Sequence, residues 1–141
     1  MKLSPDLNEA EIDAILEVCK KHPIDGFVCS NSTKKRVNIA DKNLPEKGGI
    51  SGKPMEELAN KQISYIYRKT GRKYVIIGCG GVFSAEDAYK KIKLGASLVQ
   101  LVSGMIYEGP QLIGEINKGL VRLLKKDGFN NISQAIGVDN T

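Results

Sequence analysis

Three closely spaced glycines follow an apolar run near the middle of the chain, and their backbone could bind a phosphate group. Residues 75–77 are uniformly apolar, which is typical of a strand buried on both faces in a parallel sheet. Gly78, Gly80 and Gly81 follow at once, and glycine lets the backbone turn tightly or approach a ligand closely. Free backbone N–H groups at such a turn bind phosphate. The spacing leaves two interpretations open: a phosphate site, or glycines that only shape turns.

A helix and a second strand follow this loop and would position it. Ser84 is a good N-cap residue with Asp87 three residues further on, and Gly95 is a suitable helix end. Residues 97–101 predict the next buried strand, which stops at Ser103. In a (β/α) barrel, the loops after the last two strands form the usual phosphate site. These two consecutive loops are therefore candidates for one anion site.

Polar residues end an earlier strand. Residues 27–30 predict a buried strand, and Asn31, Ser32 and Thr33 follow it. Ligands of α/β sheets bind at the carboxyl ends of strands, and an amide can both donate and accept hydrogen bonds. The alternative is that these side chains only cap a turn. Residues 34–50 form a loop of the length that lids and binding loops commonly have.

The remaining segments complete four strand–helix units. They are a strand at 1–4, a helix that starts at Asn8, a helix over 53–70, a turn at 105–107, a helix from Pro110 to Gly128 and a helical turn at 132–137. Asn8 and Glu11 have the spacing of a capping box. This alternation predicts an α/β fold with a parallel sheet and helices outside it. About four βα units make half of an eight-fold TIM barrel.

Length and composition limit the alternatives. With 141 residues the chain can form one domain, but a whole (β/α)8 barrel takes roughly 200 residues or more. The net charge of +5 would suit an anionic ligand or a nucleic acid. The lysines are spread over helix faces without a nucleic-acid motif, so a solvated basic surface is favoured and no nucleic acid is expected. No apolar run approaches the ~20 residues of a membrane-spanning helix.

The cysteines and the histidine indicate no separate chemistry. Cys19, Cys29 and Cys79 are an odd number and lack the spacing of metal ligands, so we expect reduced thiols and no metal. A Cys–His hydrolase would need His22, the only histidine, to meet a cysteine in space. Nothing in the pattern indicates such a pair.

Seven short blocks, spread over essentially the whole chain, stand in the order of a known family: Lys2–Leu7, Ile24–Gly26, Ser30–Thr33, Gly48–Pro54, Ile76–Val82, Gly95–Leu101 and Ala135–Gly137. They resemble the C-terminal half of class 2 dihydroorotate dehydrogenase, the quinone-linked FMN enzyme of pyrimidine (UMP) biosynthesis. The Ser-Gly-Lys-Pro block and the tail favour class 2 over the soluble class 1 enzymes. The resemblance implies that residues 1–141 are one partial FMN-binding TIM-barrel domain.

The resemblance also implies an FMN site. Its residues would be Lys2, Ser30, Ser51, Gly52, Cys79, Gly80, Gly81, Leu101, Val102 and Ser103. Lys2 would lie beside the pyrimidine edge of the flavin, where a fixed ammonium stabilises developing negative charge. The alternative for Lys2 is an ordinary exposed lysine. The loops at 51–52, 79–81 and 101–103 would hold the ribityl phosphate, mostly through backbone N–H groups.

The resemblance implies two substrate-binding residues. It also shows two positions at which this chain differs from the family. Asn31 and Ser32 would hydrogen-bond the dihydroorotate or orotate ring. Val102 stands where the family usually has a tyrosine beside the flavin and the quinone tunnel, which puts packing on the quinone side in doubt. Cys79 replaces a residue that is commonly small and aliphatic, and simple packing is the favoured explanation for it.

The resemblance leaves the catalytic base outside this chain. In the family, dihydroorotate loses a proton to a serine and a hydride to the flavin, which a quinone then reoxidises. That serine, and the helices that lie on the mitochondrial inner or bacterial cytoplasmic membrane, precede the segment that residues 1–141 resemble. We therefore expect a fragment that has no catalytic residue of its own and is inactive alone. An open half-barrel exposes strand edges, so we also expect the isolated chain to self-associate.

Two alternatives remain at this stage. Another FMN-dependent barrel oxidoreductase, of the class 1 dihydroorotate or dihydropyrimidine dehydrogenase type, would share the glycine loops and differ at residues 30–33 and 48–54. A non-catalytic phosphate-binding half-barrel would keep the loops without using a flavin. Retention of FMN by the purified protein would separate the enzyme lineage from the second alternative.

Overall fold

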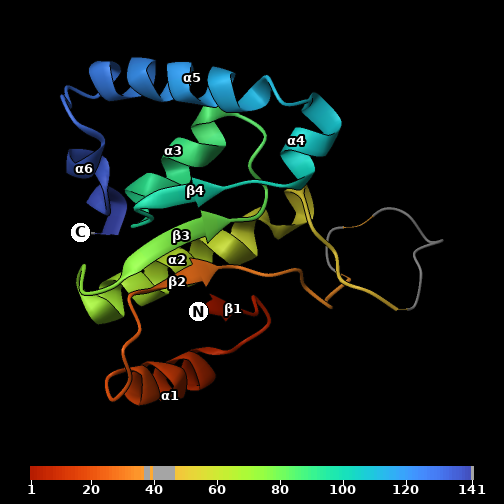
Figure 1. Cartoon of the computed structure of the whole chain (residues 1–141), viewed down its shortest axis with the longest axis vertical. Helices are drawn as coiled ribbons and strands as arrows, with labels where there is room; N and C mark the ends of the chain where they lie inside the picture. The colour runs from red at the N-terminus through yellow and green to blue at the C-terminus, as the bar shows by residue number, and fades with distance from the viewer. Residues whose placement is uncertain (37–38, 40–46, 141) are drawn as a thin grey trace.

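Four strands form one parallel sheet, and they lie side by side in the order of the chain (Figure 1). The computed structural model describes residues 1–36, 39 and 47–140. Its strands are β1 (Lys2–Leu3), β2 (Gly26–Cys29), β3 (Val75–Cys79) and β4 (Leu98–Gln100). All three neighbouring pairs are parallel, so the four carboxyl ends meet at one edge of the sheet. The α/β prediction is confirmed.

Helices connect the strands and cover them. The helical elements are α1 (Glu9–Cys19), the 3-10 helix η1 (Lys53–Met55), α2 (Glu56–Thr70), α3 (Ala85–Lys93), α4 (Ser103–Glu108), α5 (Leu112–Lys126), α6 (Ile132–Ala135) and the 3-10 helix η2 (Val138–Asn140). Successive strands are linked through α1, α2 and α3, and α5 packs along α3 as an outer layer (Figure 1). This arrangement contains the four predicted βα units.

Local signals fix the ends of several helices. Asn8 Oδ1 accepts the Glu11 N–H at 2.9 Å and Glu11 Oε2 accepts the Asn8 N–H at 2.8 Å, so the predicted capping box is formed. Gly71 ends α2 in the left-handed conformation with φ 54°. Ser84 caps α3 by accepting the Asp87 N–H at 3.1 Å. These hydrogen bonds satisfy backbone groups that helix ends would otherwise leave unpaired.

The main core lies between one face of the sheet and helices α1 and α2. The sheet contributes Leu3, Phe27, Cys29 and Ile76, each no more than 3% exposed. The helices contribute Ile12, Leu16, Cys19, Ile63 and Ile66. Side chains alternate between the two faces of a strand, and one alternate set is buried here. A second apolar cluster joins α3 to α5 through residues such as Ala88 and Ile116.

The opposite face of the sheet is open. One row across it consists of Lys2, Val28, Ile77 and Leu98, which the strand register places side by side. Leu98 is 58% exposed, and Val75 on the same face is 45% exposed. The predictions of buried strands at 75–77 and 97–101 are therefore wrong for Val75 and Leu98, because no element in the described part of the chain covers this face.

Two further predictions differ from the structure or lie outside it. Residues 105–107 belong to the helix α4 and do not form a turn; α4 has only six residues, and Val102 at its start gives no side-chain cap that would have signalled a helix. The interpretation of 34–50 as a lid or binding loop falls largely on residues 37, 38 and 40–46, which lie outside the described residues.

Tyr67 joins α2 to the C-terminal segment. Its ring lies between Gly95 and Gly137, where an added Cβ would come within 2.4 and 2.1 Å of ring atoms. The Tyr67 hydroxyl donates to the Ile136 carbonyl at 3.3 Å, and Arg72 Nη2 donates to the same carbonyl at 2.7 Å. Only glycine leaves room for this ring on both sides, so three separate segments are fixed to one another here.

Candidate functional site

The residues predicted to bind ligands gather around one cavity at the carboxyl edge of the sheet. The cavity has a volume of about 180 Å³. It is lined by all the predicted residues: Lys2, Ser30, Asn31, Ser32, Ser51, Gly52, Cys79, Gly80, Gly81, Leu101, Val102 and Ser103. The parallel sheet brings these segments together because each strand ends at the same edge. The structure thus shows their proximity, and their roles in binding remain predictions.

Backbone hydrogen bonds on both sides hold the end of β2 in place. The Ser30 N–H donates to the Cys79 carbonyl at the end of β3 at 2.8 Å. The Asn31 N–H donates to the Leu3 carbonyl at the end of β1, also at 2.8 Å. The Asn31 side chain makes no contact that fixes it elsewhere among the described residues and lies at the rim of the cavity. Asn31 is thus attached to the rigid sheet, as a group that orients a ligand should be.

Asp6 extends this support to the next residues, and the sequence analysis had not identified it. Its carboxylate accepts the Thr33 hydroxyl through Oδ1 and the Lys34 N–H through Oδ2, the latter at 2.8 Å. Desolvation opposes the charged form, but these hydrogen bonds outweigh it and lower the pKa of Asp6. Thr33 also pairs with Ile50 by two backbone hydrogen bonds of 3.0 and 2.8 Å. Residues 31–33 are therefore held close to 50–52.

The glycine loop after β3 requires its glycines. Gly80 and Gly81 have φ of +117° and +74°, which L side chains rarely adopt. A Cβ added at Gly81 would lie 2.5 Å from the Glu56 Cβ and 2.8 Å from its Cα, so the loop packs closely on the first turn of α2. The prediction of a tight backbone turn at this point is confirmed.

Two hydroxyl groups join the remaining loops. Ser51 Oγ and Ser103 Oγ are 3.0 Å apart and share a hydrogen bond between the loop before η1 and the start of α4. Gly52 lies against Ser103 and Phe83, with an added Cβ 3.4 and 3.8 Å from their side chains. Three loops thus meet within a small volume, and the phosphate cradle that the family resemblance implies for them remains a prediction.

The groups that line this cavity could satisfy a ligand that carries both a polar ring and a phosphate. Ser30 is only 2% exposed, and its Oγ has no hydrogen-bond partner among the described residues. A buried hydroxyl without a partner is destabilising unless a ligand or water satisfies it. The loop at 80–81 offers backbone without side chains where a phosphate could approach. Residues present in the cavity could therefore satisfy both a ring with polar edges and an anionic group.

An exposed apolar strip lies beside the cavity. Val102, Ile106 and Tyr107 are 57%, 71% and 79% exposed, and Met105 is 39% exposed. The Tyr107 ring stacks on Phe83, which lines the cavity, with 6.4 Å between ring centroids. Apolar surface concentrated beside a cavity commonly marks an interaction site.

A buried cation lies behind the glycine loop, and the sequence had given no sign of it. Lys91 of α3 is fully buried, and its Nζ donates to Asn60 Oδ1 at 2.7 Å. Its alkyl chain packs under Gly78, where an added Cβ would be 3.1 Å from Lys91 Cδ. Desolvation lowers the pKa of Lys91 to about 8. Because a lysine in a helix is usually exposed, the sequence alone would place it on the surface.

The cysteines and the acidic residues of the described part of the chain form neither a disulfide nor a metal cluster. All three cysteines are free and buried, and burial raises the pKa of Cys29 to about 12. The described residues contain no cluster of three or more His, Cys, Asp or Glu that could hold a metal ion. In the same part of the chain, no helix combines the length and the apolar character needed to cross a membrane.

The fold and the site define a class of protein: an α/β partial barrel with a glycine-lined cavity at the carboxyl ends of parallel strands. Within that class, the chain belongs to the dihydroorotate dehydrogenase family, whose model matches residues 1–124. This result confirms the resemblance drawn from the sequence blocks.

Two curated relatives show how much of the family the chain covers. Dihydroorotate dehydrogenase (quinone) of Synechocystis sp. is 42% identical over 147 residues, which are 99% of this chain and 39% of the relative. The mitochondrial dihydroorotate dehydrogenase (quinone) of Arabidopsis thaliana is 44% identical over 142 residues, which are 99% of this chain and 31% of the relative. The chain therefore spans less than two fifths of the length of these relatives.

A solved structure agrees with the fold. The crystal structure of ligand-free DHODH from Eimeria tenella matches with a TM-score of 0.93 and 34% sequence identity. The match covers 99% of this chain and 39% of that protein. The arrangement of strands and helices described above is therefore that of part of a dihydroorotate dehydrogenase.

Proposed function

We propose that this chain is the part of a quinone-linked dihydroorotate dehydrogenase that binds FMN and the dihydroorotate ring. The observation that carries the proposal is the convergence of all the predicted residues on one cavity, in which the Ser30 hydroxyl is buried and has no hydrogen-bond partner among the described residues. The curated relatives carry the name dihydroorotate dehydrogenase (quinone). We therefore favour this activity over the class 1 and dihydropyrimidine dehydrogenase alternatives, and over a phosphate-binding half-barrel without flavin.

The loops would supply most of the contacts to the cofactor. We assign the phosphate of FMN to backbone N–H groups at Gly52, Gly80 and Gly81 and to the hydroxyls of Ser51 and Ser103. The close packing of these loops fixes their N–H groups before a ligand arrives, which lowers the entropic cost of binding. The remaining FMN contacts proposed are those of Lys2, Ser30, Cys79, Leu101 and Val102.

Three side chains would act on the reacting rings. When bound, FMN supplies the electron-accepting ring of the reaction. Lys2 is the first residue of β1, is exposed and lines the cavity, and its ammonium would favour negative charge that develops on a ring beside it. Asn31 and Ser32 would orient dihydroorotate or orotate by pairing with its N–H and C=O groups. The backbone contacts of Asn31 with β1 make this orientation precise.

We assign no proton-abstracting base to this chain. The family's serine base lies in a segment that these 141 residues do not resemble, and the relatives are more than twice as long. The chain would then be inactive alone, and dihydroorotate oxidation would need the remaining part of the enzyme. Quinone would approach along the exposed apolar strip at Val102, Ile106 and Tyr107. We place the complete enzyme at a membrane, where quinones reside; the Arabidopsis relative is mitochondrial by name.

Titration of the 141-residue chain with FMN and then with orotate tests this proposal. We expect the flavin fluorescence to report FMN binding, and the flavin absorbance to shift when orotate is added. Asn31→Ala should weaken orotate binding by about tenfold while FMN binding is kept, since it removes the groups that pair with the ring. Asn117→Ala, on an exposed part of α5, is the matched control.

Each other outcome has a definite meaning. Binding of FMN without any response to orotate would favour another FMN-dependent barrel. Binding of inorganic phosphate but not of flavin would favour a half-barrel without redox function. Turnover of dihydroorotate with a quinone by the chain alone would refute the assignment of the base to another segment.

A further inference from the structure

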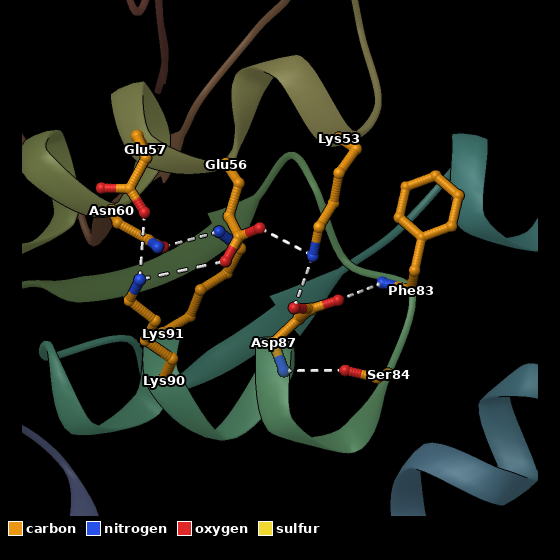
Figure 2. A network of polar contacts seen from close by, with 9 residues as sticks. All are labelled: Lys53, Glu56, Glu57, Asn60, Phe83, Ser84, Asp87, Lys90 and Lys91. Atoms are coloured by element: carbon orange, nitrogen blue, oxygen red, sulfur yellow. Dashed lines mark hydrogen bonds and ion pairs between the residues drawn. The ribbon is translucent and has the colours of Figure 1, made fainter.

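An acidic side chain on α3 connects two loops of the cavity that belong to different βα units. Asp87 Oδ1 accepts a hydrogen bond from Lys53 Nζ at 2.7 Å, and Asp87 Oδ2 accepts the Phe83 N–H at 2.9 Å (Figure 2). Lys53 directly follows Gly52, and Phe83 ends the glycine loop of β3. One carboxylate therefore holds the loop at 51–53 and the loop at 80–83 at a fixed separation.

This connection is held by the near burial of one partner and by a second ion pair of the other. The Asp87 side chain is 12% exposed, and Lys53 makes a second ion pair with Glu56 Oε2 at 2.7 Å. Desolvation disfavours both charged groups, but their hydrogen bonds outweigh it, so the pKa of Asp87 is lowered and that of Lys53 is raised. Both groups are held in their charged forms at neutral pH.

Glu56 also ties the same two loops by packing. Its Cα and Cβ lie against Gly81, so closely that no side chain fits there. The carboxylate of Glu56 meanwhile pairs with Lys53 from the other side. The loops are thus joined twice, once by backbone packing at Gly81 and once by the Lys53–Asp87 ion pair. Neither Lys53 nor Asp87 lines the cavity in the described part of the chain.

We propose that Lys53 and Asp87 are positioning residues that set the distance between the two loops and so determine how tightly the cavity holds the phosphate of a flavin nucleotide. This inference rests on the proposed function, which assigns FMN to the cavity. Lys53 and Asp87 act through the backbone of Gly52 and Phe83, without touching the ligand. A displacement of one loop relative to the other separates N–H groups that must reach the same phosphate, and small displacements of this kind reduce affinity strongly.

A purely structural ion pair makes a different prediction. It would change the stability of the folded chain and would affect every ligand of the cavity to the same degree. A pair that positions the phosphate loops affects ligands that carry a phosphate and spares those that lack it. FMN and riboflavin share the same ring and ribityl chain, and only FMN carries the phosphate, so the two ligands separate these explanations.

Titration of the 141-residue chain with FMN and with riboflavin is the test. For Lys53→Met and Asp87→Asn we expect FMN affinity to fall by about tenfold and riboflavin affinity to change by less than about twofold, since charge-assisted hydrogen bonds are lost only between the loops. Lys53→Arg keeps the charge and should bind FMN nearly as well as the wild type. Lys69→Met is the matched control, because Lys69 pairs with Asp13 at 2.9 Å between α2 and α1, is similarly exposed and joins neither loop.

The outcomes decide the inference and the proposed function separately. Equal loss of both flavins in the two variants, or unchanged FMN affinity, would overturn the positioning role while the proposed function stands. A wild-type chain that binds neither flavin would overturn the proposed function and this inference with it. If circular dichroism shows that Asp87→Asn is unfolded, Lys53→Met decides, because the Lys53 side chain is 56% exposed and its replacement leaves the core intact.

Discussion

The two faces of the sheet differ in cover, although both carry mostly apolar side chains. On the face toward α1 and α2, Phe27 and Ile76 are each 1% exposed. On the other face, Leu98 is 58% exposed and Val75 is 45% exposed. The neighbours Val75 and Ile76 on β3 differ in this way although both are apolar, so residue type alone does not decide burial here. What decides it is whether another segment of the chain packs on that side.

Two lysines, Lys2 and Lys91, differ in exposure in the same way. Lys2 lies exposed on the open face and lines the cavity. Lys91 lies fully buried behind the covered face, with Asn60 as its hydrogen-bond acceptor. Desolvation lowers the pKa of Lys91 to about 8. Burying a charged lysine on the covered side costs desolvation free energy. A charged lysine on the open face keeps its ammonium accessible to a ligand.

The largest expected effect compares one apolar truncation on each face. Ile63→Ala removes a fully buried side chain from the covered core and should lower the free energy of unfolding by about 2–5 kcal/mol. Leu98→Ala on the open face is the matched truncation and should lower it by less than about 1 kcal/mol. Urea unfolding followed by circular dichroism measures both. The measurement is made at a dilution at which sedimentation shows a monomer, and similar losses at the two positions would then show that the open face is covered within the chain itself.

The second effect concerns the pH dependence that Lys91 confers. Its pKa is about 8 in the folded chain against 10.5 ordinarily, so the unfolded state binds more protons between these values and stability rises with pH in that window. The rise should reach at most about 3 kcal/mol and should level off above pH 10.5.

The difference between the wild type and Lys91→Met isolates this contribution. In urea unfolding from pH 7 to 10.5, the free energy of unfolding of the wild type should rise relative to that of Lys91→Met as the pH increases. Lys118→Met on α5 is the control for loss of an exposed lysine and should give a flat difference. A flat difference for Lys91→Met as well would mean that the buried ammonium is fully compensated by its surroundings.

The smallest effect on stability is expected on the open face, together with a clear effect on association. Leu98→Lys should change the free energy of unfolding by less than about 0.5 kcal/mol, as surface substitutions usually do. The wild-type chain should self-associate through its open sheet face and edges, and the added charge should shift it toward the monomer in sedimentation. Val121→Lys on α5 replaces a residue of similar exposure, 52%, and should leave association unchanged. A monomeric wild type would refute the expectation.

Local sequence signals predicted the elements that carry the site. Asn8 with Glu11 and Ser84 with Asp87 gave helix starts, because an N-cap acts within four residues of itself. The glycines at 80 and 81 marked a turn that needs positive φ. Parallel strand order then implied that the loops after them share one edge of the sheet. The proximity of the loops after β2, β3 and β4 follows from these local features, whereas the assignment of Lys2, Ser51 and Gly52 to the site came from the family resemblance.

Features that depend on distant partners were not predictable. The Ser84-x-x-Asp87 spacing predicts an ordinary cap, but the Asp87 carboxylate binds Lys53, 34 residues away in the sequence. Lys91 resembles any helix lysine until α2 is placed over it. The exposure of Leu98 likewise depends on the absence of a covering element in the described part of the chain, which an apolar pattern does not report. Such properties belong to the assembled fold.

The ring of Tyr67 between Gly95 and Gly137 has a consequence for synthesis of the protein. Tyr67 and its acceptor Ile136 are 69 residues apart, so the ribosome makes α2 long before the segment that fastens it. During that interval the flank of α2 that meets this segment stays unprotected. A nascent chain halted between these two points should therefore be more readily digested by proteases at α2 than one that has passed Gly137.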